Sequence, residues 1–493
     1  MSARKWMIVA ATATPLLVGG AWLCKGKGYW YAVKQSLGLV PPLTEESIQT
    51  TGNLPKDWGM QIYAEVDPDL RFTKTPQPVA DDVGWTCVLV GPDGALWGGS
   101  DDGRIARFEL DANGDLGEPV WYTSLQDQAG GPRLLTGFVF EPGRPADDPV
   151  VWAVHNYFAF HDAPDFSSTI STLRGPGLSE VADVVVGLPR STGDHATNQA
   201  AFGSDGCLYF TQASNSGFGD PDETWGMRPE RLLNASTLKL DPAKLDDLPL
   251  DVTTAGGGGD YDPFAPDAPL TIYAYGVRLA YDLVFHSNGH LYIPVNGSSP
   301  GGNIPACPDG NAPAVKAVPF SEHDWLLDAK EGAYYGHPNP SQGYYIFNGA
   351  NPTDGEDFAE CPQYPVGTMP DPNYDPPIRD LGDHRSANGV IEFVNVNNTP
   401  AEQKLAGTLV ICRYSLGADL TVIRVDEDGQ FAEEIEGIPG FIDFANPLDV
   451  TQDITTGHLY VCDYGARAII RVTAESHCSE SQAMYTNVGV SDR

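Results

Sequence analysis

Short stretches of alternating apolar and polar residues recur along the chain, and glycine-containing turns join them in pairs. In each pair an apolar strand enters the turn, and the second strand carries an aromatic residue near its start. A period of two is typical of strands, and Asp-Gly or Asn-Gly between two such runs is the strongest local signal of a β-hairpin. The clearest copies are Cys87–Ser100, Ala200–Ser214, Asp282–Gly297 and Leu448–Gly465. The pattern therefore predicts a series of antiparallel hairpins.

Two looser copies and one internal match extend this series. The looser copies span Phe138–Tyr157 and Gly389–Ser415, and segments starting at Leu409 and Leu459 both end in Ile-Arg-Val after a strand, a turn and a strand. Six units at irregular spacing favour a radial repeat over a solenoid, and six blades need roughly 270 residues. Residues 76–475 provide these and leave room for long inter-blade loops. We therefore expect an all-β fold, a six-bladed β-propeller, with an unclosed β-sandwich as the alternative.

The rest of the chain differs from the repeat in composition. Residues 1–27 contain an uninterrupted apolar stretch, Trp6–Leu23, which predicts a signal peptide or an uncleaved membrane anchor. Residues 28–75 are predicted to be a polar linker and lead-in, and residues 476–493 a C-terminal tail. Within the propeller, residues 298–388 are rich in Pro, Gly, Asn and Tyr and are expected to form the main insertion.

Charge and cysteine content narrow the function classes. The 493 residues include 66 Asp and Glu against 29 Lys and Arg, a formal net charge of −37, which argues against binding to nucleic-acid phosphates or anionic lipid. We expect an extracytoplasmic protein, periplasmic or secreted, that contacts a membrane only through its N-terminal segment. The eight cysteines include no CxxC pair, so a zinc ribbon, a thioredoxin-like site and a c-type haem have no support. Disulfides are permitted in an exported chain, and Cys307 with Cys361 is one possible pair within the insertion.

Three positions near the predicted hairpins carry candidate chemistry. Asp194 and His195, with Asn198, stand just before one hairpin, where a histidine can face the propeller axis and take a proton from a substrate hydroxyl. Arg278 stands before a later hairpin, and arginine suits a planar carboxylate or a quinone oxygen. Arg413 interrupts an apolar strand and is expected to point into the central channel. The alternatives are a backbone-bound loop histidine, a surface arginine and an Arg413 ion pair with a carboxylate such as that of residue 463.

Two further stretches suggest ligands. Asn296, Gly297 and Ser298 form a turn whose carbonyl oxygens are hard ligands that suit Ca²⁺. Within the insertion, Tyr335 and His337 lie in a Tyr-Tyr-Gly-His-Pro-Asn-Pro stretch, and rings on a capping loop suit stacking against a sugar. The alternative for this stretch is a plain ordered loop.

The order of these segments over residues 80–475 resembles the soluble quinoprotein glucose/sorbosone dehydrogenases. The resemblance rests on Asp-His before one hairpin, Tyr-Gly-Val-Arg before a later one, Tyr-Gly-His-Pro-Asn-Pro in the insertion, and the last two strand–turn–strand units. Members of this family are six-bladed propellers that bind pyrroloquinoline quinone (PQQ) and Ca²⁺ and oxidise aldoses. The resemblance implies the same fold, cofactors and reaction class for this chain.

The resemblance also implies individual roles. His195 matches the general base that takes the proton of the sugar C1 hydroxyl while hydride passes to the quinone, and Asp194 matches the neighbouring acid that contacts substrate. Arg278 matches the arginine near the reactive quinone carbonyl. Gly297 and Ser298 fall where backbone carbonyls hold Ca²⁺, a Lewis acid on the quinone.

The remaining cofactor contacts are less regular. Arg413 falls close to the place of a cation on a quinone carboxylate, and Asn198 and Asn296 are further candidates for cofactor contact. Glucose-type members have Asn where this chain has Leu279, and an Arg-x-Arg pair where it has Asn446–Asp449.

The function favoured by these observations is an exported PQQ- and calcium-dependent dehydrogenase. It would oxidise the C1 hydroxyl of an aldose or a related sugar or aldehyde to a lactone and pass electrons to a separate acceptor, because the sequence has no haem motif. Two alternatives are a non-catalytic binding propeller that has lost the cofactor and a calcium-dependent hydrolase of the lactonase or esterase kind.

Overall fold

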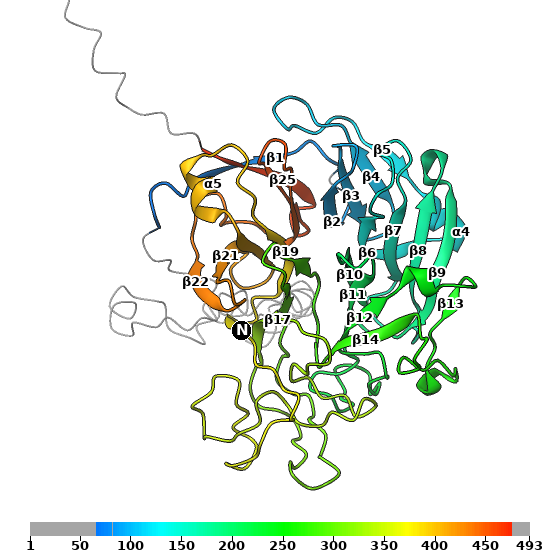
Figure 1. The fold of residues 1–493 in the computed structure, drawn as a ribbon, viewed down its shortest axis with the longest axis vertical. Helices are drawn as coiled ribbons and strands as arrows, with labels where there is room; N and C mark the ends of the chain where they lie inside the picture. Colours follow the sequence, from blue (N-terminus) through cyan, green and yellow to red (C-terminus); the bar gives the residue numbers. More distant parts are fainter. Residues whose placement is uncertain (1–65, 81, 476–493) are drawn as a thin grey trace, which may run out of the picture. The chain divides into compact units, whose positions relative to one another are not determined.

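Six antiparallel β-sheets stand around a central axis in the computed structural model, which describes residues 66–80 and 82–475 (Figure 1). The six-bladed propeller expected from the hairpin repeat is confirmed. The predictions of an N-terminal anchor in residues 1–27 and a tail in residues 476–493 lie outside the described residues. In the described part of the chain, no helix is both long enough and apolar enough to cross a bilayer.

Each blade is a four-stranded antiparallel sheet whose first strand lies nearest the axis, and one blade gains a fifth strand. Blade 1 consists of β2 (Trp85–Val90), β3 (Leu96–Ser100), β4 (Ile105–Phe108) and β5 (Val120–Tyr122). Blade 2 consists of β6 (Arg133–Phe140), β7 (Val151–Tyr157), β8 (Ser168–Arg174) and β9 (Glu180–Leu188), and is extended by β13 (Leu250–Asp251). Blade 3 consists of β10 (Thr197–Phe202), β11 (Leu208–Gln212), β12 (Ser236–Leu240) and β14 (Leu270–Tyr275). Blade 4 consists of β15 (Val284–Phe285), β16 (Leu291–Val295), β17 (His323–Asp328) and β18 (Arg379–Asp383). Blade 5 consists of β19 (Ala387–Glu392), β20 (Thr408–Arg413), β21 (Asp419–Val425) and β22 (Phe431–Ile435). Blade 6 consists of β23 (Pro447–Gln452), β24 (Leu459–Asp463), β25 (Ala468–Ala474) and β1 (Phe72–Pro76). The described helices α4 (Ser124–Ala129) and α5 (Pro400–Leu405) are each six residues long.

The six predicted hairpins supply the two innermost strands of the six blades. In blade 3, for example, Ala200 of β10 pairs with Phe210 of β11. The turn glycines adopt the positive φ that an Asp-Gly or Asn-Gly hairpin requires, with φ of 78° at Gly206 and 92° at Gly289. The sequence pattern therefore located the part of each blade that lines the axis.

The ring closes through a strand from the N-terminal side of the repeat. Strand β1 pairs with β25, Phe72 opposite Ala474 and Pro76 opposite Ile470, and becomes the outermost strand of blade 6. The final part of the 28–75 segment, expected as lead-in, thus belongs to the last blade. Because the two strands are almost 400 residues apart, the pairing ties the ends of the propeller together.

The 298–388 segment is not a single insertion, which corrects the sequence-based prediction. It contains β17 and β18, the outer strands of blade 4, so the inserted chain consists of two loops, residues 296–322 and 329–378. The two loops share a hydrophobic cluster that includes Phe218, Ile304, Phe347, Cys361 and Tyr364. In the described part of the chain the cysteines are free thiols, Cys307 and Cys361 included.

The core is divided among the blade interfaces. Six clusters of buried residues each join two successive blades, and the cluster between blades 5 and 6 includes Phe72 of β1. Both faces of the sheets are therefore covered, which explains why strands such as β20 read as nearly continuous apolar runs.

Two carboxyl groups lie near the axis, where the innermost strands meet. Asp449 of β23 is buried and accepts a hydrogen bond from Val88 N at 2.8 Å. Asp282, just before β15, is half-buried and accepts one from Val390 N at 2.9 Å. Burial raises the pKa of both carboxyl groups, and the charge of Asp449 raises the pKa of Asp282 further. The pair therefore holds a proton at pH values where an ordinary aspartate has lost it.

Replacing Asp449 by Asn should reduce the pH dependence of stability. A folded-state pKa above that of the unfolded chain means that stability is lost as the pH rises, by about 1.4 kcal/mol per pH unit and proton. We expect the melting temperature of the wild type to fall between about pH 5 and about pH 8, and that of Asp449→Asn to fall less. The exposed Asp246→Asn variant, which also removes one charge, is the control. Parallel pH profiles for wild type and Asp449→Asn would contradict the shared proton.

Candidate active site

His195 lies in the loop that leads into β10, and its side chain is only 2 % exposed. Its Nδ1 is 3.0 Å from the carbonyl oxygen of Ser214 and 3.2 Å from the Ser214 hydroxyl oxygen. Because a carbonyl oxygen only accepts, Nδ1 carries the hydrogen and Nε2 keeps a lone pair. Ser214 follows β11, the strand paired with β10, so the hairpin itself orients the imidazole.

The surroundings of His195 keep it neutral. Burial holds the pKa of His195 well below its usual value, and the positive charge of Arg278 lowers it further. The indole ring of Trp225 packs on the imidazole with ring centroids 3.8 Å apart. Because the pKa is low, the imidazole is unprotonated at neutral pH, and the Nε2 lone pair can accept a proton.

Arg278 follows β14 and is buried without a carboxylate in direct contact. Its Nε donates to Gly217 O at 3.1 Å, and its Nη1 donates to Asn296 O at 3.1 Å and Gly297 O at 2.9 Å. Burial lowers the pKa of Arg278, and four carboxylates at longer range oppose this effect: Glu322, Asp324, Asp194 and Glu230. Within the described ranges Nη2 makes no hydrogen bond, so it is the part of the guanidinium left to contact a ligand.

Asp194 is exposed next to the buried His195. Burial raises the pKa of Tyr414, which follows β20 in blade 5, and the charges of Asp194 and Asp463 raise it further. Asp194 in blade 3 therefore lies within electrostatic range of blades on other sides of the axis. The structure brings His195 and Asp194 within electrostatic range of Arg278.

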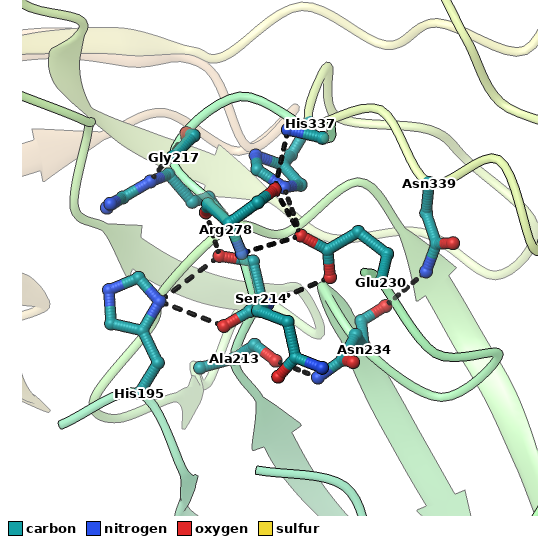
Figure 2. Close-up of polar contacts among 12 residues, drawn as sticks. His195, Ala213, Ser214, Gly217, Glu230, Asn234, Arg278, His337 and Asn339 are labelled. Carbon is teal, nitrogen blue, oxygen red and sulfur yellow. Dashed lines mark hydrogen bonds and ion pairs between the residues drawn. The ribbon is translucent and has the colours of Figure 1, made fainter. Parts of the chain in front are cut away.

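A buried hydrogen-bond network lies behind these residues, and Figure 2 shows Ser214, Glu230 and His337 within it. The Ser214 hydroxyl donates to Ser216 O at 2.9 Å, and the Ser216 hydroxyl donates to Glu230 Oε1 at 2.6 Å. The same Glu230 oxygen is 3.2 Å from His337 Nε2. The network joins the loop between β11 and β12 to the insertion, so both long loops support the position of His195.

The sugar-stacking prediction for Tyr335 and His337 is wrong, because both side chains are buried. The Tyr335 hydroxyl donates to Asp328 O at 2.7 Å, and its ring belongs to the core between blades 3 and 4. Asn339, two residues after His337, donates to Arg231 O at 2.8 Å. The motif thus docks the insertion onto the loop between β11 and β12 and presents no ring to solvent.

Asn198 and Asn296 connect blades. Asn198 Nδ2 donates to Ala280 O at 2.9 Å, and Asn296 Nδ2 donates to Ala387 O at 3.0 Å. These bonds join blade 3 to blade 4 and blade 4 to blade 5. The cofactor contact predicted for both amides has no support in this geometry, and we assign them the role of fixing the blades beside His195 and Arg278.

Comparisons with known proteins define the fold. No family model matches the chain, and no curated protein does. The chain superposes on the PQQ domain of pyranose dehydrogenase from Coprinopsis cinerea with a TM-score of 0.54 and 12% identity, covering 83% of this chain and 97% of that domain. A calcium structure of a Trichoderma reesei protein of carbohydrate-active enzyme family AA12 gives 0.51 at 15% identity, covering 85% and 99%. A glucose dehydrogenase gives 0.51 at 14% identity, covering 82% and 100%.

The chain has the fold of these sugar dehydrogenases. Identities of 12% to 15% establish the architecture and leave the chemistry to be argued from the residues. His195 lies in the loop that leads into β10, and Arg278 lies in the loop between β14 and β15, so both residues precede the innermost strand of a blade.

The residues predicted to bind calcium do not fit a metal ion. The Gly297 carbonyl oxygen accepts from Arg278 Nη1 at 2.9 Å, and the Ser298 carbonyl oxygen accepts from Glu322 N at 2.8 Å. A divalent cation on Gly297 O would face a guanidinium within a few ångströms and be repelled. In the described ranges no three His, Cys, Asp or Glu side chains are arranged to hold a metal. The predicted site at Gly297 and Ser298 is therefore not supported by this geometry.

Arg413 is buried in β20 of blade 5. Its Nε donates to Asp419 Oδ1 at 2.7 Å, its Nη2 donates to Asp419 Oδ2 at 2.5 Å, and its Nη1 contacts Glu436. Arg413 and Asp419 face each other in the ladder between β20 and β21. The guanidinium is thus neutralised within its own blade, and its predicted role on a cofactor carboxylate has no support here.

Sequence reasoning missed Ser214, Trp225 and Glu230, which orient or support His195. Trp225 and Glu230 lie in the loop between β11 and β12, whose role depends on how it folds back over the hairpin. The one available signal was the length of this loop, because long loops between strands of a propeller commonly carry function.

Proposed function

We propose that this chain is a quinone-dependent dehydrogenase that oxidises the C1 hydroxyl of an aldose or a related sugar to a lactone. The observation that carries the proposal is the neutral His195, whose Nδ1–H is fixed on a carbonyl and whose Nε2 carries the lone pair that acts as a base. The fold shared with the PQQ domain of pyranose dehydrogenase supports this class of reaction.

The residues present fit the reacting end of a quinone such as PQQ. Arg278 is a buried cation that contacts no carboxylate directly among the described residues, and its Nη2 is left for a carbonyl oxygen. PQQ, when bound, supplies the acceptor for the hydride that leaves C1. His195 Nε2 takes the hydroxyl proton, Asp194 is placed to accept a hydrogen bond from a neighbouring sugar hydroxyl, and Trp225 fixes the plane of the imidazole.

The proposal includes no calcium at Gly297 and Ser298, because protein donors already occupy both carbonyl oxygens. It does include a separate electron acceptor and an extracytoplasmic location. These two elements are supported by the absence of a haem motif and by the apolar stretch Trp6–Leu23 in the sequence.

A second candidate function is a binding propeller without catalysis. The observation that favours it is the ion pairing of Arg413, which removes a cation that a tricarboxylate cofactor would use. The two candidates differ in one measurable property, the affinity for the quinone.

Titration of the full-length protein with PQQ, with and without the chelator EDTA, tests the proposal. We expect saturable binding at about 10 μM quinone or below, and a change of less than about twofold on adding EDTA. Replacing Arg278 by Gln should weaken binding by about tenfold or more, because Gln cannot supply the guanidinium charge. The Arg424→Gln variant, which alters a surface ion pair in blade 5, is the matched control.

Two results would contradict the proposal. Absence of quinone binding would favour the non-catalytic propeller. A strict requirement for Ca²⁺ would contradict a quinone site that forms without a metal.

A further inference from the structure

Three exposed aromatic side chains occupy one short segment beside the candidate site. Tyr157 is 48% exposed, Phe158 38% and Phe160 42%. The rings of Phe158 and Phe160 lie 6.2 Å apart in a T-shaped arrangement. Exposed apolar side chains that are grouped on a surface are a candidate binding site, whereas single exposed ones are ordinary.

A fully buried arginine holds this segment in place. Arg190 donates from Nη1 to Tyr157 O and from Nη2 to Ala159 O, and its Nη2 is also 3.4 Å from Gly193 O. The guanidinium thus links the backbone of the aromatic segment to the backbone of Gly193, the residue before Asp194. Among the described residues Arg190 Nε has no hydrogen-bond partner, so the Nη1 and Nη2 bonds compensate for the desolvation of the guanidinium and fix the carbonyls of the segment.

A second arginine fixes the far end of the segment. Arg228 Nη2 donates to Ala163 O at 2.9 Å, and Ala163 N donates to Thr192 O at 3.1 Å. Residues 157–163 are therefore bound at both ends to the chain that leads into His195. A surface that is held rigid in this way loses little conformational entropy when a ligand binds.

The segment adjoins the candidate active site. A Cβ placed on Gly193 would lie 3.1 Å from the ring of Trp225, which packs on His195, and 3.9 Å from the carbonyl oxygen of Phe160. Gly193 and Trp225 thus lie between the aromatic segment and His195.

The chemistry of the segment suits a carbohydrate. Phe158 and Phe160 offer aromatic faces to the C–H face of a pyranose ring, and the exposed His161 and Asp162 can hydrogen-bond its hydroxyl groups. The six residues can cover one or two sugar rings. That area is far smaller than the roughly 800 Å² per partner that a stable protein interface buries, which favours a sugar over a protein as the ligand.

We propose that residues 157–162 form an accessory sugar subsite, so that the substrate is an oligosaccharide whose reducing-end ring enters at His195 while the next ring packs on Phe158 and Phe160. This inference rests on the proposed function for the identity of the reacting end. It goes further in assigning the substrate class and the residues that select it.

The test measures binding by calorimetry in the full-length protein without cofactor, using glucose, maltotriose and cellotriose as probes. We expect at least one trisaccharide to bind about tenfold more tightly than glucose, and the Phe158→Ala/Phe160→Ala double variant to lose that advantage. The Phe264→Ala variant, whose ring is 57% exposed on the loop before β14, is the control. Both aromatic side chains are exposed, so an unchanged melting temperature verifies that the variant is folded.

The outcomes separate this inference from the proposed function. Loss of trisaccharide binding in the double variant supports the subsite even if no sugar is oxidised, in which case only the proposed chemistry fails. Equal affinities for glucose and both trisaccharides, or a double variant that binds them like wild type, overturn the subsite. In the reconstituted enzyme the double variant should raise KM for the trisaccharide and leave kcat for glucose unchanged.

Discussion

Replacing His195 by Gln should reduce sugar oxidation by about 10²- to 10⁴-fold and leave quinone binding intact. Gln can still donate a hydrogen bond to Ser214 O, but it has no basic lone pair in place of Nε2. The measurement is dye-coupled turnover in the reconstituted full-length protein, together with a quinone titration of the same variant. His458→Gln, which changes a half-buried histidine of blade 6, is the control.

The pH profile gives a second readout for the same residue. Because burial and Arg278 hold the pKa of His195 well below its usual value, the base is already deprotonated at about pH 6 to 8. Titration of His195 should therefore cause no rise in the wild-type rate across this pH range. The profile of His195→Gln should have the same shape at a lower rate. Undiminished turnover in the variant would remove His195 from the mechanism, and a rise centred near the ordinary histidine pKa would contradict its buried environment.

The fold was predictable because its signals are local. The turn glycines at positions 206 and 289 and the alternation on either side define hairpins without reference to the rest of the chain. The pairing of β1 with β25 has no local signal, because Phe72 and Ala474 meet only when the ring closes. Strand β17 was hidden for a related reason, since its short apolar run is surrounded by Pro- and Gly-rich loops whose composition dominated the prediction.

The candidate site was predictable where backbone position alone decides the outcome. His195 and Arg278 both lie in loops that precede the innermost strands of neighbouring blades, β10 and β15, and the propeller brings such positions together. The predictions that failed depend on what a side chain meets in three dimensions. Tyr335 and His337 looked like exposed capping residues and are buried against another loop, and the Gly297 carbonyl looked available and is occupied by Arg278.

The ion pair of Arg413 with Asp419 could have been predicted from the sequence. The hairpin between β20 and β21 places Arg413 opposite Asp419, six residues later, across a short turn. A carboxylate at the facing position of an antiparallel pair is the natural partner of a strand arginine. The partner suggested from the sequence, the carboxylate of Asp463, occupies the equivalent position of the next repeat, in β24 of blade 6, and equivalent positions of two repeats do not face each other across one ladder.

Replacing Arg413 by Met should destabilise the protein by about 3–5 kcal/mol, because the Asp419 carboxylate stays fully buried when its bidentate guanidinium is removed. The double variant Arg413→Met/Asp419→Leu removes both charges and should recover most of the loss, since apolar residues of similar size often replace a buried ion pair without penalty. Denaturant unfolding of the two variants measures both effects. Arg424→Met, which breaks the surface pair with Glu433, is the control and should cost about 0–1 kcal/mol.

The same variants decide between a structural and a cofactor-binding Arg413. If Arg413 serves to stabilise blade 5, the double variant, once folded, should bind PQQ with an affinity within about twofold of wild type. If Arg413 holds a quinone carboxylate, the single variant should have normal stability. The double variant should then bind PQQ about tenfold or more weakly, because a charged partner has been lost. The bidentate geometry with Asp419 and the contact with Glu436 favour the first result, since a guanidinium already matched by two carboxylates gains little from a third.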